Sequence, residues 1–476
     1  MSLRPTLAPA SPLAQDADLP AASAAAPPLA PRTRLILTGP VLPTLLKLAA
    51  PNIAVMMVQA VMSAVDAFYL GWLGADALAG VALVYPLIML MMTMSAGGLG
   101  GGISSAVARA LGRRDQAAAD ALATHALVIS VGFAAVFTVG PLLLGQHLYA
   151  AMGGTGGALE AALTYSNIIF AAAALLWLIN GLASILRGSG QMMVPSAVLI
   201  GGEVVHIALA PALIFGWGPF PALGVQGAAI ALVSTLALRA SILVVYMASG
   251  RSLVTPRLWG VQLTAASFWE ILRVGVPGAV NTILTSGNIM LLTGLVGTFG
   301  TAALAGYGLG ARLEYLLIPL VFGLGAALVT MVGMNVGAGQ IERAKRIAWA
   351  GSGLSAALTG SIGLVAATMP WLWLGMFTTD PSVLEAGSAY LRIVGPTYAF
   401  FGLGLALYFA SQGAGRLLWP LVGATARLVV AAGGGGLAVY LLGVGLPGIF
   451  VATALGIAGF GTIVGLAVRG ARWGAR

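Results

Sequence analysis

The sequence predicts an all-α membrane protein in which twelve transmembrane helices form two six-helix lobes. Its composition, its series of apolar segments and an internal repeat all indicate this fold class. Of the 476 residues, 59% are hydrophobic and only 7% are charged, whereas about 25% of the residues in soluble domains are charged. Because so few charges cannot cover a globule of this size, the composition excludes a soluble enzyme. The chain has no cysteine, which excludes disulfides and thiolate metal sites.

Twelve apolar segments follow one another from about residue 43. Each is long enough to cross a bilayer, which takes about 20 residues. Seven of the 24 prolines lie within residues 1–31, among Ala and Ser, so we predict a disordered N-terminal tail. The predicted spans lie near residues 43–70, 77–106, 119–145, 160–186, 193–216, 226–249, 271–297, 302–335, 347–370, 387–411, 419–441 and 447–468.

Basic residues fall in every second interval between the predicted spans. Lys and Arg number 22 against 13 Asp and Glu, and the intervening loops contain no Lys or Arg at all. Cytoplasmic loops of membrane proteins carry such an excess. We therefore expect a multi-pass protein of the inner (plasma) membrane with both termini in the cytoplasm, and no nucleic-acid partner despite the formal charge of +9.

The two halves of the chain are repeats of each other. Residues 71–80 and 297–306 are identical at six of ten positions, and Arg187-Gly188-Ser189-Gly190 aligns with Gln412-Gly413-Ala414-Gly415. Six spans per repeat keep both halves in the same orientation, which places the repeat axis along the membrane normal and a site between the lobes near the midplane. This architecture is typical of transporters, and a channel or a receptor explains the repeat less well.

The repeat and the tail together predict the domain organisation. The boundaries are 1–42 for a disordered cytoplasmic N-terminal tail, 43–250 for the N-lobe, 251–270 for a cytoplasmic linker between the lobes, 271–468 for the C-lobe and 469–476 for a cytoplasmic C-terminal tail.

Three separated groups of motifs resemble one family, the multidrug and toxic compound extrusion (MATE) family of cation-coupled antiporters. The resemblance covers roughly residues 43–468. It implies two six-helix lobes around a central cavity and export of small-molecule organic cations in exchange for H⁺ or Na⁺, by a monomer without a cofactor. The motifs are 48–51, 65–68 and 73–80; 214–218 and 223–229; and 310–314, 336–339 and 342–344.

Two other transporter families stay open as alternatives. A major facilitator transporter also has twelve helices in parallel repeats, and residues 110–115 (ALGRRD) suit the basic loop after its second helix. The acidic residue expected early in that loop is missing, because residues 104–106 (SSA) carry no charge. A flippase for lipid-linked precursors, which has a related fold, is the second alternative.

Asp66 is the first candidate for ion coupling. Ionisable groups inside a span are costly and are functional candidates by default, and an apolar surrounding disfavours the charged form of a carboxylate. Pro51 in the same predicted helix marks a possible bend. The repeat equivalent of Asp66 is Leu292, so the acid occurs in one lobe only. It resembles the helix 1 acid that the family uses for ion coupling.

Glu203 and His206 are the next candidates for ion coupling. Many relatives have an Asn and, four residues later, an Asp before a Pro in helix 5, whereas this chain has His206 and Ala210 before Pro211. Glu203 lies one helical turn before His206 on the same face, so we predict that the two share a proton. The alternative is a structural ion pair between Glu203 and Arg239 of the adjacent helix.

The C-lobe offers candidates for substrate binding. A carboxylate at Glu314, deep in helix 8, attracts a cation unless Arg427 or Arg312 neutralises it. We also predict contributions from Tyr85 and Tyr307, by stacking on aromatic cations, and from Asn180, which otherwise forms a hydrogen bond between helices. The helix 10 acid of some family members has no counterpart in residues 398–402 (YAFFG), which favours H⁺ over Na⁺ as the coupling ion.

Overall fold

The computed structural model of the chain describes residues 30–257, 260, 262–471 and 473. In this part of the chain, eleven helices are long and apolar enough to cross a membrane, and α6 and α7, which meet at a bend of 48°, together form a possible twelfth span. The predicted all-helical, multi-span fold is therefore confirmed. The helices are α1 (Pro31–Thr38), α2 (Val41–Gly71), α3 (Ala75–Thr93), η1 (Met94–Leu99), α4 (Gly100–Gly112), α5 (Gln116–Ala151), α6 (Gly156–Ala171), α7 (Ala173–Gly188), α8 (Met193–Phe215), α9 (Gly224–Ala248), α10 (Ala265–Gly297), α11 (Thr301–Gly337), α12 (Ile341–Thr368), α13 (Pro370–Leu374), α14 (Pro381–Val394), η2 (Gly395–Thr397), α15 (Tyr398–Ala414), α16 (Leu418–Leu428), η3 (Val429–Gly433), α17 (Gly434–Tyr440) and α18 (Leu446–Gly470).

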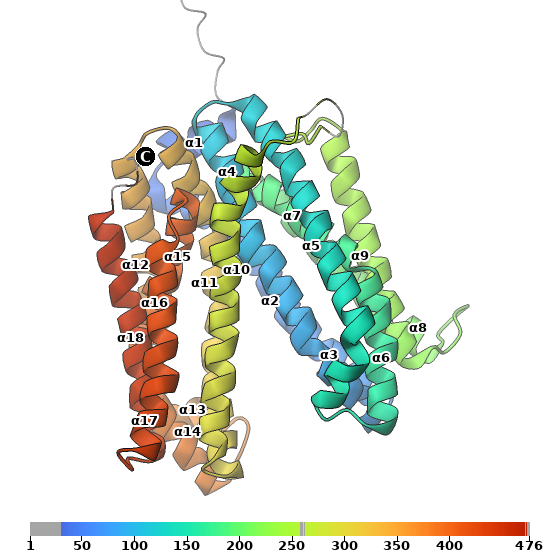
Figure 1. The fold of residues 1–476 in the computed structure, drawn as a ribbon, viewed down its shortest axis with the longest axis vertical. Coiled ribbons are helices and arrows are strands. Elements are labelled where there is room, and N and C mark those ends of the chain that lie inside the picture. Colours follow the sequence, from blue (N-terminus) through green and yellow to red (C-terminus); the bar gives the residue numbers. More distant parts are fainter. Residues whose placement is uncertain (1–29, 258–259, 261, 472, 474–476) are drawn as a thin grey trace, which may run out of the picture.

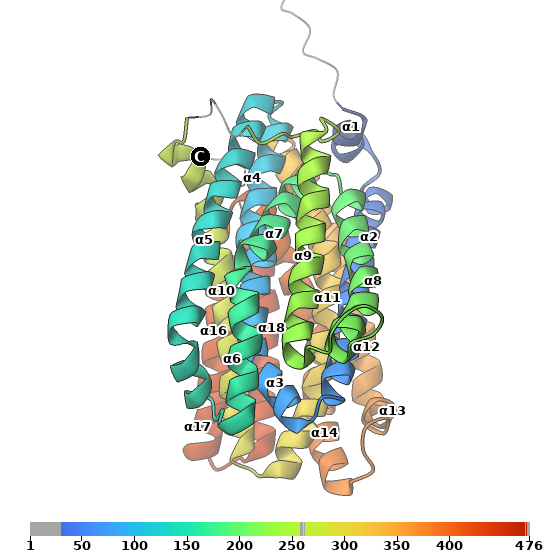
Figure 2. The same ribbon diagram turned by 90° about the vertical axis from the view of Figure 1, so that its right-hand side faces the viewer.

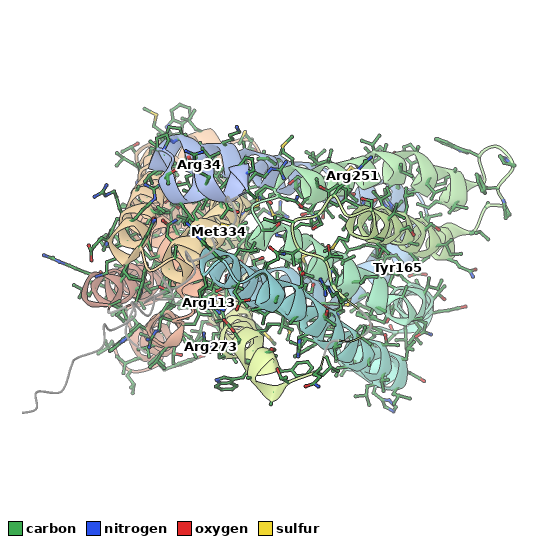
Figure 3. All side chains as sticks on the ribbon, turned by 90° about the horizontal axis from the view of Figure 1, so that it is seen from above. Arg34, Arg113, Tyr165, Arg251, Arg273 and Met334 are labelled. Atoms are coloured by element: carbon green, nitrogen blue, oxygen red, sulfur yellow. The ribbon has the colours of Figure 1, made fainter. Side chains whose placement is uncertain are left out.

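The helices form two groups that meet at one end. Lobe 1 comprises α2 to α9 and lobe 2 comprises α10 to α18 (Figures 1 and 2). Their ribbons converge at the end that carries α1 and the C-terminal end, and they diverge towards the other end (Figure 1). Figure 3 looks down on the converging end, with Arg34, Arg113, Arg251 and Arg273 labelled. We call this the arginine-bearing end.

The prediction of a disordered tail up to residue 42 is wrong for residues 31–42. Pro31 occupies the first turn of α1, where a missing N–H costs nothing. The buried side chains of Ile36 and Leu37 hold α1 against α11, and Arg343 donates hydrogen bonds to the carbonyl oxygens of Ile36 and Gly39. The remainder of the predicted tail, residues 1–29, lies outside the described residues.

The predicted linker between the lobes is also shorter than expected. Helix α10 begins at Ala265, because the side chain of Thr264 accepts a hydrogen bond from the backbone N–H of Ser267 and caps the helix. Glu270, predicted to be the last linker residue, therefore lies within α10. This places its carboxylate beside lobe 1 at the arginine-bearing end.

Glycines let the lobes touch backbone to backbone at the arginine-bearing end. A methyl group on Gly112 of α4 would overlap with the carbonyl oxygen of Met334 in α11, and one on Gly337 of α11 would overlap with the carbonyl oxygen of Arg109 in α4. These two contacts are the repeat images of each other, so α4 and α11 meet across the repeat axis as identical subunits meet across a twofold axis.

One inserted residue explains the shift in repeat register. Gly71 and Gly297 occupy equivalent positions of the two repeats before η1, and Gly112 and Gly337 occupy equivalent positions after it. The separation in sequence between the two residues is one smaller for the second pair than for the first. The π-helix η1 accommodates the extra residue of the first repeat between α3 and α4, whereas α11 continues without a break. A π-bulge is the usual way for a helix to absorb one inserted residue.

We predict that Gly337→Val separates the lobes at the arginine-bearing end. Overpacking of a tight contact costs about 1–3 kcal/mol, which here destabilises the converged state. Since the chain has no cysteine, a single Ser104→Cys substitution reports on this contact, and its thiol should react faster with a water-soluble maleimide in the Gly337→Val background. Gly132→Val on α5, where a methyl group meets open space, is the control. Equal reaction rates in the Gly337→Val and Gly132→Val backgrounds would contradict the prediction.

Candidate functional site

Asp66 and His206 form a hydrogen-bonded acid–base pair in lobe 1. The Nε2 atom of His206 in α8 lies 3.0 Å from Oδ1 of Asp66 in α2. The Asp66 side chain is 41% exposed, whereas that of His206 is 5% exposed. Asp66 lies one turn before the end of α2, about 7 Å along the helix from its last residue. The pair therefore has one accessible member and one buried member near the diverging end.

A small pocket surrounds this pair. Helices α2, α6, α8 and α9, which stand side by side in lobe 1 (Figure 2), contribute its walls. Ala210 lies in the wall, at the position where the resemblance led us to expect an acid, and Tyr165 of α6 lines the opposite part. The lining residues are Asp66, Leu70, Tyr165, His206, Ala210, Ile214, Ala228 and Leu232.

The pair can hold a proton in more than one arrangement. A carboxylate accepts hydrogen bonds when ionised and donates one when protonated, and an imidazole binds a proton at either ring nitrogen. The Nδ1 atom of His206 is buried without a hydrogen-bond partner, so Asp66 is the contact through which the imidazole is satisfied. Protonation of Asp66 therefore changes the hydrogen bond that His206 makes.

In this structure Glu203 is paired with Arg239 rather than with His206. Its Oε1 atom lies 3.1 Å from Nη1 of Arg239 in α9, and both side chains are largely buried. The stem of Arg239 crosses α8 at Gly202, where a methyl group would collide with its side chain. The geometry thus corresponds to the structural ion pair, and the predicted Glu203–His206 pairing is replaced by an Asp66–His206 pairing.

Glu314 is neutralised in lobe 2. Nη2 of Arg427 lies 2.6 Å from its Oε1 atom, and the Tyr390 hydroxyl donates to Oε2 at 3.3 Å. The Arg427 guanidinium also lies over the ring of Phe401, 5.4 Å from its centroid. Because this buried carboxylate already has a cation and a hydroxyl as partners, it offers no free charge to a substrate in this conformation.

The other predicted binding residues lie apart from one another. Tyr85 is 44% exposed, and its hydroxyl lies 3.5 Å from the Ser63 hydroxyl. Tyr307 is 5% exposed and packs against the rings of Tyr390 and Phe450. Asn180 donates a 2.8 Å hydrogen bond to the Ser95 hydroxyl of η1. Their roles in substrate binding stay predictions. Pro51 lies inside α2, which continues past it.

Sequence reasoning missed a polar network that joins the lobes. Arg109 follows the predicted span 77–106 and so was expected in a basic interval between spans, but it is buried in α4, where it donates to the Ser105 hydroxyl and to the carbonyl oxygen of Gly413 in α15. Glu270 of α10 lies 3.7 Å from Arg109 and 3.6 Å from Arg113. The glycine-rich surroundings of Arg109 were the available signal, since glycines at a helix surface permit close approach of a second helix.

Comparison with known proteins gives one consistent family. Residues 51–212 and 277–434 match the sequence profile of the MatE family. Probable multidrug resistance protein YoeA of Bacillus subtilis is 27% identical over 356 residues, which cover 74% of this chain and 76% of that protein. An FAD transporter of Shewanella oneidensis is 26% identical over 385 residues, which cover 79% of this chain and 82% of that protein.

A solved structure shares the fold. It is described as the outward-facing conformation of a multidrug resistance MATE family transporter of the MOP superfamily, and it superposes with a TM-score of 0.84 at 24% identity. The superposition covers 93% of this chain and 98% of the other.

We predict that Glu203→Gln lowers the thermal stability of the protein. The substitution leaves Arg239 buried without a counter-charge, and breaking a buried ion pair from one side costs about 3–5 kcal/mol. Adding Arg239→Gln should restore part of the lost stability, because it removes the unpaired charge. Thermal unfolding of the purified variants measures both effects. An unchanged melting temperature combined with loss of pH-dependent transport would instead favour a role in proton transfer.

Proposed function

This chain belongs to the MATE family of multidrug efflux transporters, and from this premise we propose that it exports amphiphilic organic cations in exchange for protons. The family match sets aside the major facilitator alternative. The Asp66–His206 pair carries the proposal, because it joins an accessible acid to a buried base inside a membrane-spanning lobe.

Proton exchange at this pair links transport to the pH gradient. When Asp66 is ionised, it accepts a hydrogen bond from the N–H group at His206 Nε2 and carries a negative charge at the pocket. When Asp66 is protonated, that charge is lost and the hydrogen bond must be rearranged. A cationic substrate nearby favours the ionised form, so substrate binding and proton release favour each other, as antiport requires.

The composition of the pocket favours H⁺ over Na⁺. Sodium, like other hard cations, prefers several oxygen ligands, whereas the pocket offers one carboxylate beside an imidazole and a phenol. Within the described residues, no group of three or more His, Asp or Glu side chains is arranged to hold a metal ion. A carboxylate and an imidazole in contact are sufficient to bind a proton.

The distribution of charge supports a proposed orientation of the protein in the membrane. We place the arginine-bearing end in the cytoplasm of an inner-membrane protein, because cytoplasmic segments carry the excess of Lys and Arg. The lobes then converge on the cytoplasmic side and diverge on the outer side (Figure 1), and this arrangement supports our assignment of an outward-facing state. In this state Asp66 lies near the outer surface, where protons enter during export.

Replacement of Asp66 tests the proposed function. Asp66→Asn should leave the fold and substrate binding intact but abolish export driven by a pH gradient, because an amide cannot exchange a proton. Export of a fluorescent organic cation from proteoliposomes, with imposed pH or Na⁺ gradients, measures this.

Asp76→Asn is the matched control, since Asp76 is an exposed acid in the first turn of α3 at the same end of lobe 1. It should export at the wild-type rate. Wild-type export by Asp66→Asn, or export that follows only a Na⁺ gradient, would disprove proton coupling at this pair.

A further inference from the structure

Arg109 of lobe 1 is buried by lobe 2 at the arginine-bearing end. Its side chain is 5% exposed, and its Nη1 atom donates a 3.3 Å hydrogen bond to the carbonyl oxygen of Gly413. A methyl group on Gly415 would lie 3.0 Å from the same nitrogen atom. Gly413 belongs to α15 in lobe 2, and Gly415 is the C-cap of that helix. Separation of the lobes at this end would therefore expose Arg109 to water.

The guanidinium of Arg109 is only partly satisfied in this position. Its Nη1 atom also donates to the Ser105 hydroxyl, but Nε and Nη2 are buried without a hydrogen-bond partner among the described residues. Nη2 lies 3.7 Å from Oε1 of Glu270 in α10, which provides a counter-charge at a distance beyond that of a hydrogen bond. Because a guanidinium has five N–H donors, Arg109 gains hydrogen bonds to water when the contact opens.

The other half of the repeat fills the equivalent position with an apolar side chain. Arg109 and Met334 each precede the glycine of the α4–α11 contact by three residues, and Met334 is labelled in Figure 3. Met334 is fully buried, and its Cε atom lies 3.9 Å from the position of a methyl group on Gly190 of lobe 1. Gly190 is the repeat equivalent of Gly415. The interface therefore has two equivalent packing positions, one that holds a cation and one that holds a thioether.

The counter-charge also occurs in one repeat only. Glu270 corresponds to Thr44 in the first repeat. Glu270 is 24% exposed and also lies 3.6 Å from Arg113, whose side chain is 39% exposed. Without Arg109, Glu270 thus keeps both a cation and water as partners. In the described part of the chain, by contrast, Arg109 pairs with no carboxylate other than Glu270.

Buried ion pairs respond differently to the loss of one partner and to the loss of both. Removing one partner is strongly destabilising, because it leaves a buried charge uncompensated. Replacing the pair by well-packed apolar side chains is often neutral or stabilising, because charges must leave water to enter the interface. For the contact between the lobes, the first case is loss of Glu270, and an apolar residue in place of Arg109 corresponds to the second.

We propose that Arg109 is an opening device for the cytoplasmic side of the transporter and that Glu270 controls it. Burial of the guanidinium makes the closed contact less stable than an apolar contact of the same shape, so that the lobes separate during each transport cycle. Glu270 offsets part of this cost and holds the contact closed. This inference rests on the proposed function, because it requires the arginine-bearing end to open for uptake of substrate.

A simple structural tie between the lobes makes a different prediction. If Arg109 and Glu270 only hold the lobes together, loss of either residue should open the contact and lower the thermal stability. The opening device predicts effects of opposite sign for the two residues. Arg109→Met is the informative variant, because Met334 already occupies the equivalent position.

The experiment measures opening of the contact in purified full-length protein at fixed pH, without a gradient. The reporter is Ser104→Cys, at a position beside Gln412 of lobe 2, and the measured quantity is its rate of reaction with a water-soluble maleimide. Glu270→Gln should raise this rate about tenfold or more, where tenfold corresponds to about 1.4 kcal/mol, and it should lower the melting temperature. Arg109→Met should lower the rate and raise the melting temperature.

Two further variants separate the pair from its surroundings. Adding Arg109→Met to Glu270→Gln should restore the slow reaction, because no buried cation is left to compensate. Arg113→Gln is the matched control and should have little effect, because an exposed ion pair contributes little to stability. Export of an organic cation from proteoliposomes should be slower in Arg109→Met than in the wild type, since the contact opens less often.

The sign of the Arg109→Met effect decides the proposal. A faster thiol reaction in this variant, its failure to fold, or a wild-type reaction rate in Glu270→Gln would overturn the opening device. Absence of pH-driven export by the wild type would instead refute the proposed function. The thiol measurements need no gradient, so they would still show how Arg109 affects the contact between the lobes.

Discussion

The glycine-mediated contact between α4 and α11 is the constraint on which the rest of the structure depends. At Gly112 and Gly337 the two backbones approach too closely for any side chain, and the paired hydrogen bonds from Ser105 and Thr330 fix the lobes in register. With the lobes joined at one end, they are free to diverge at the other (Figure 1).

The repeat supplies a symmetric frame, and departures from symmetry supply the chemistry. Asp66 stands where the second lobe has Leu292, and Arg187 stands where it has Gln412. A symmetric backbone lets one lobe move against the other about a fixed site. We propose that charges present in one lobe only give that movement a direction, because the acid at Asp66 has no equivalent acid at Leu292 in lobe 2.

The sequence predicted the spans, the repeat and the basic end well, because each depends on local composition or on a constant offset. The pairing of charges was harder to predict. Asp66 and His206 are 140 residues apart. Whether His206 contacts Asp66 or Glu203 depends on how α2 and α8 are rotated about their axes. Arg109 was expected in a loop because α4 continues beyond the apolar segment from which the span was predicted. Helix α1 was missed because a single pair of apolar side chains anchors it.

The central claim is that protonation of the Asp66–His206 pair controls how far the lobes diverge. Spin labels on cysteines introduced at Met152 and Leu442, exposed residues at the diverging ends of lobes 1 and 2, report this directly by pulsed electron paramagnetic resonance. The account predicts that the distance between the labels shortens as the pH falls from about 8 to about 5, the interval in which histidine side chains in general change charge. It also predicts that Asp66→Asn abolishes this change. A distance that does not depend on pH, or one that changes equally in Asp66→Asn, would contradict the account.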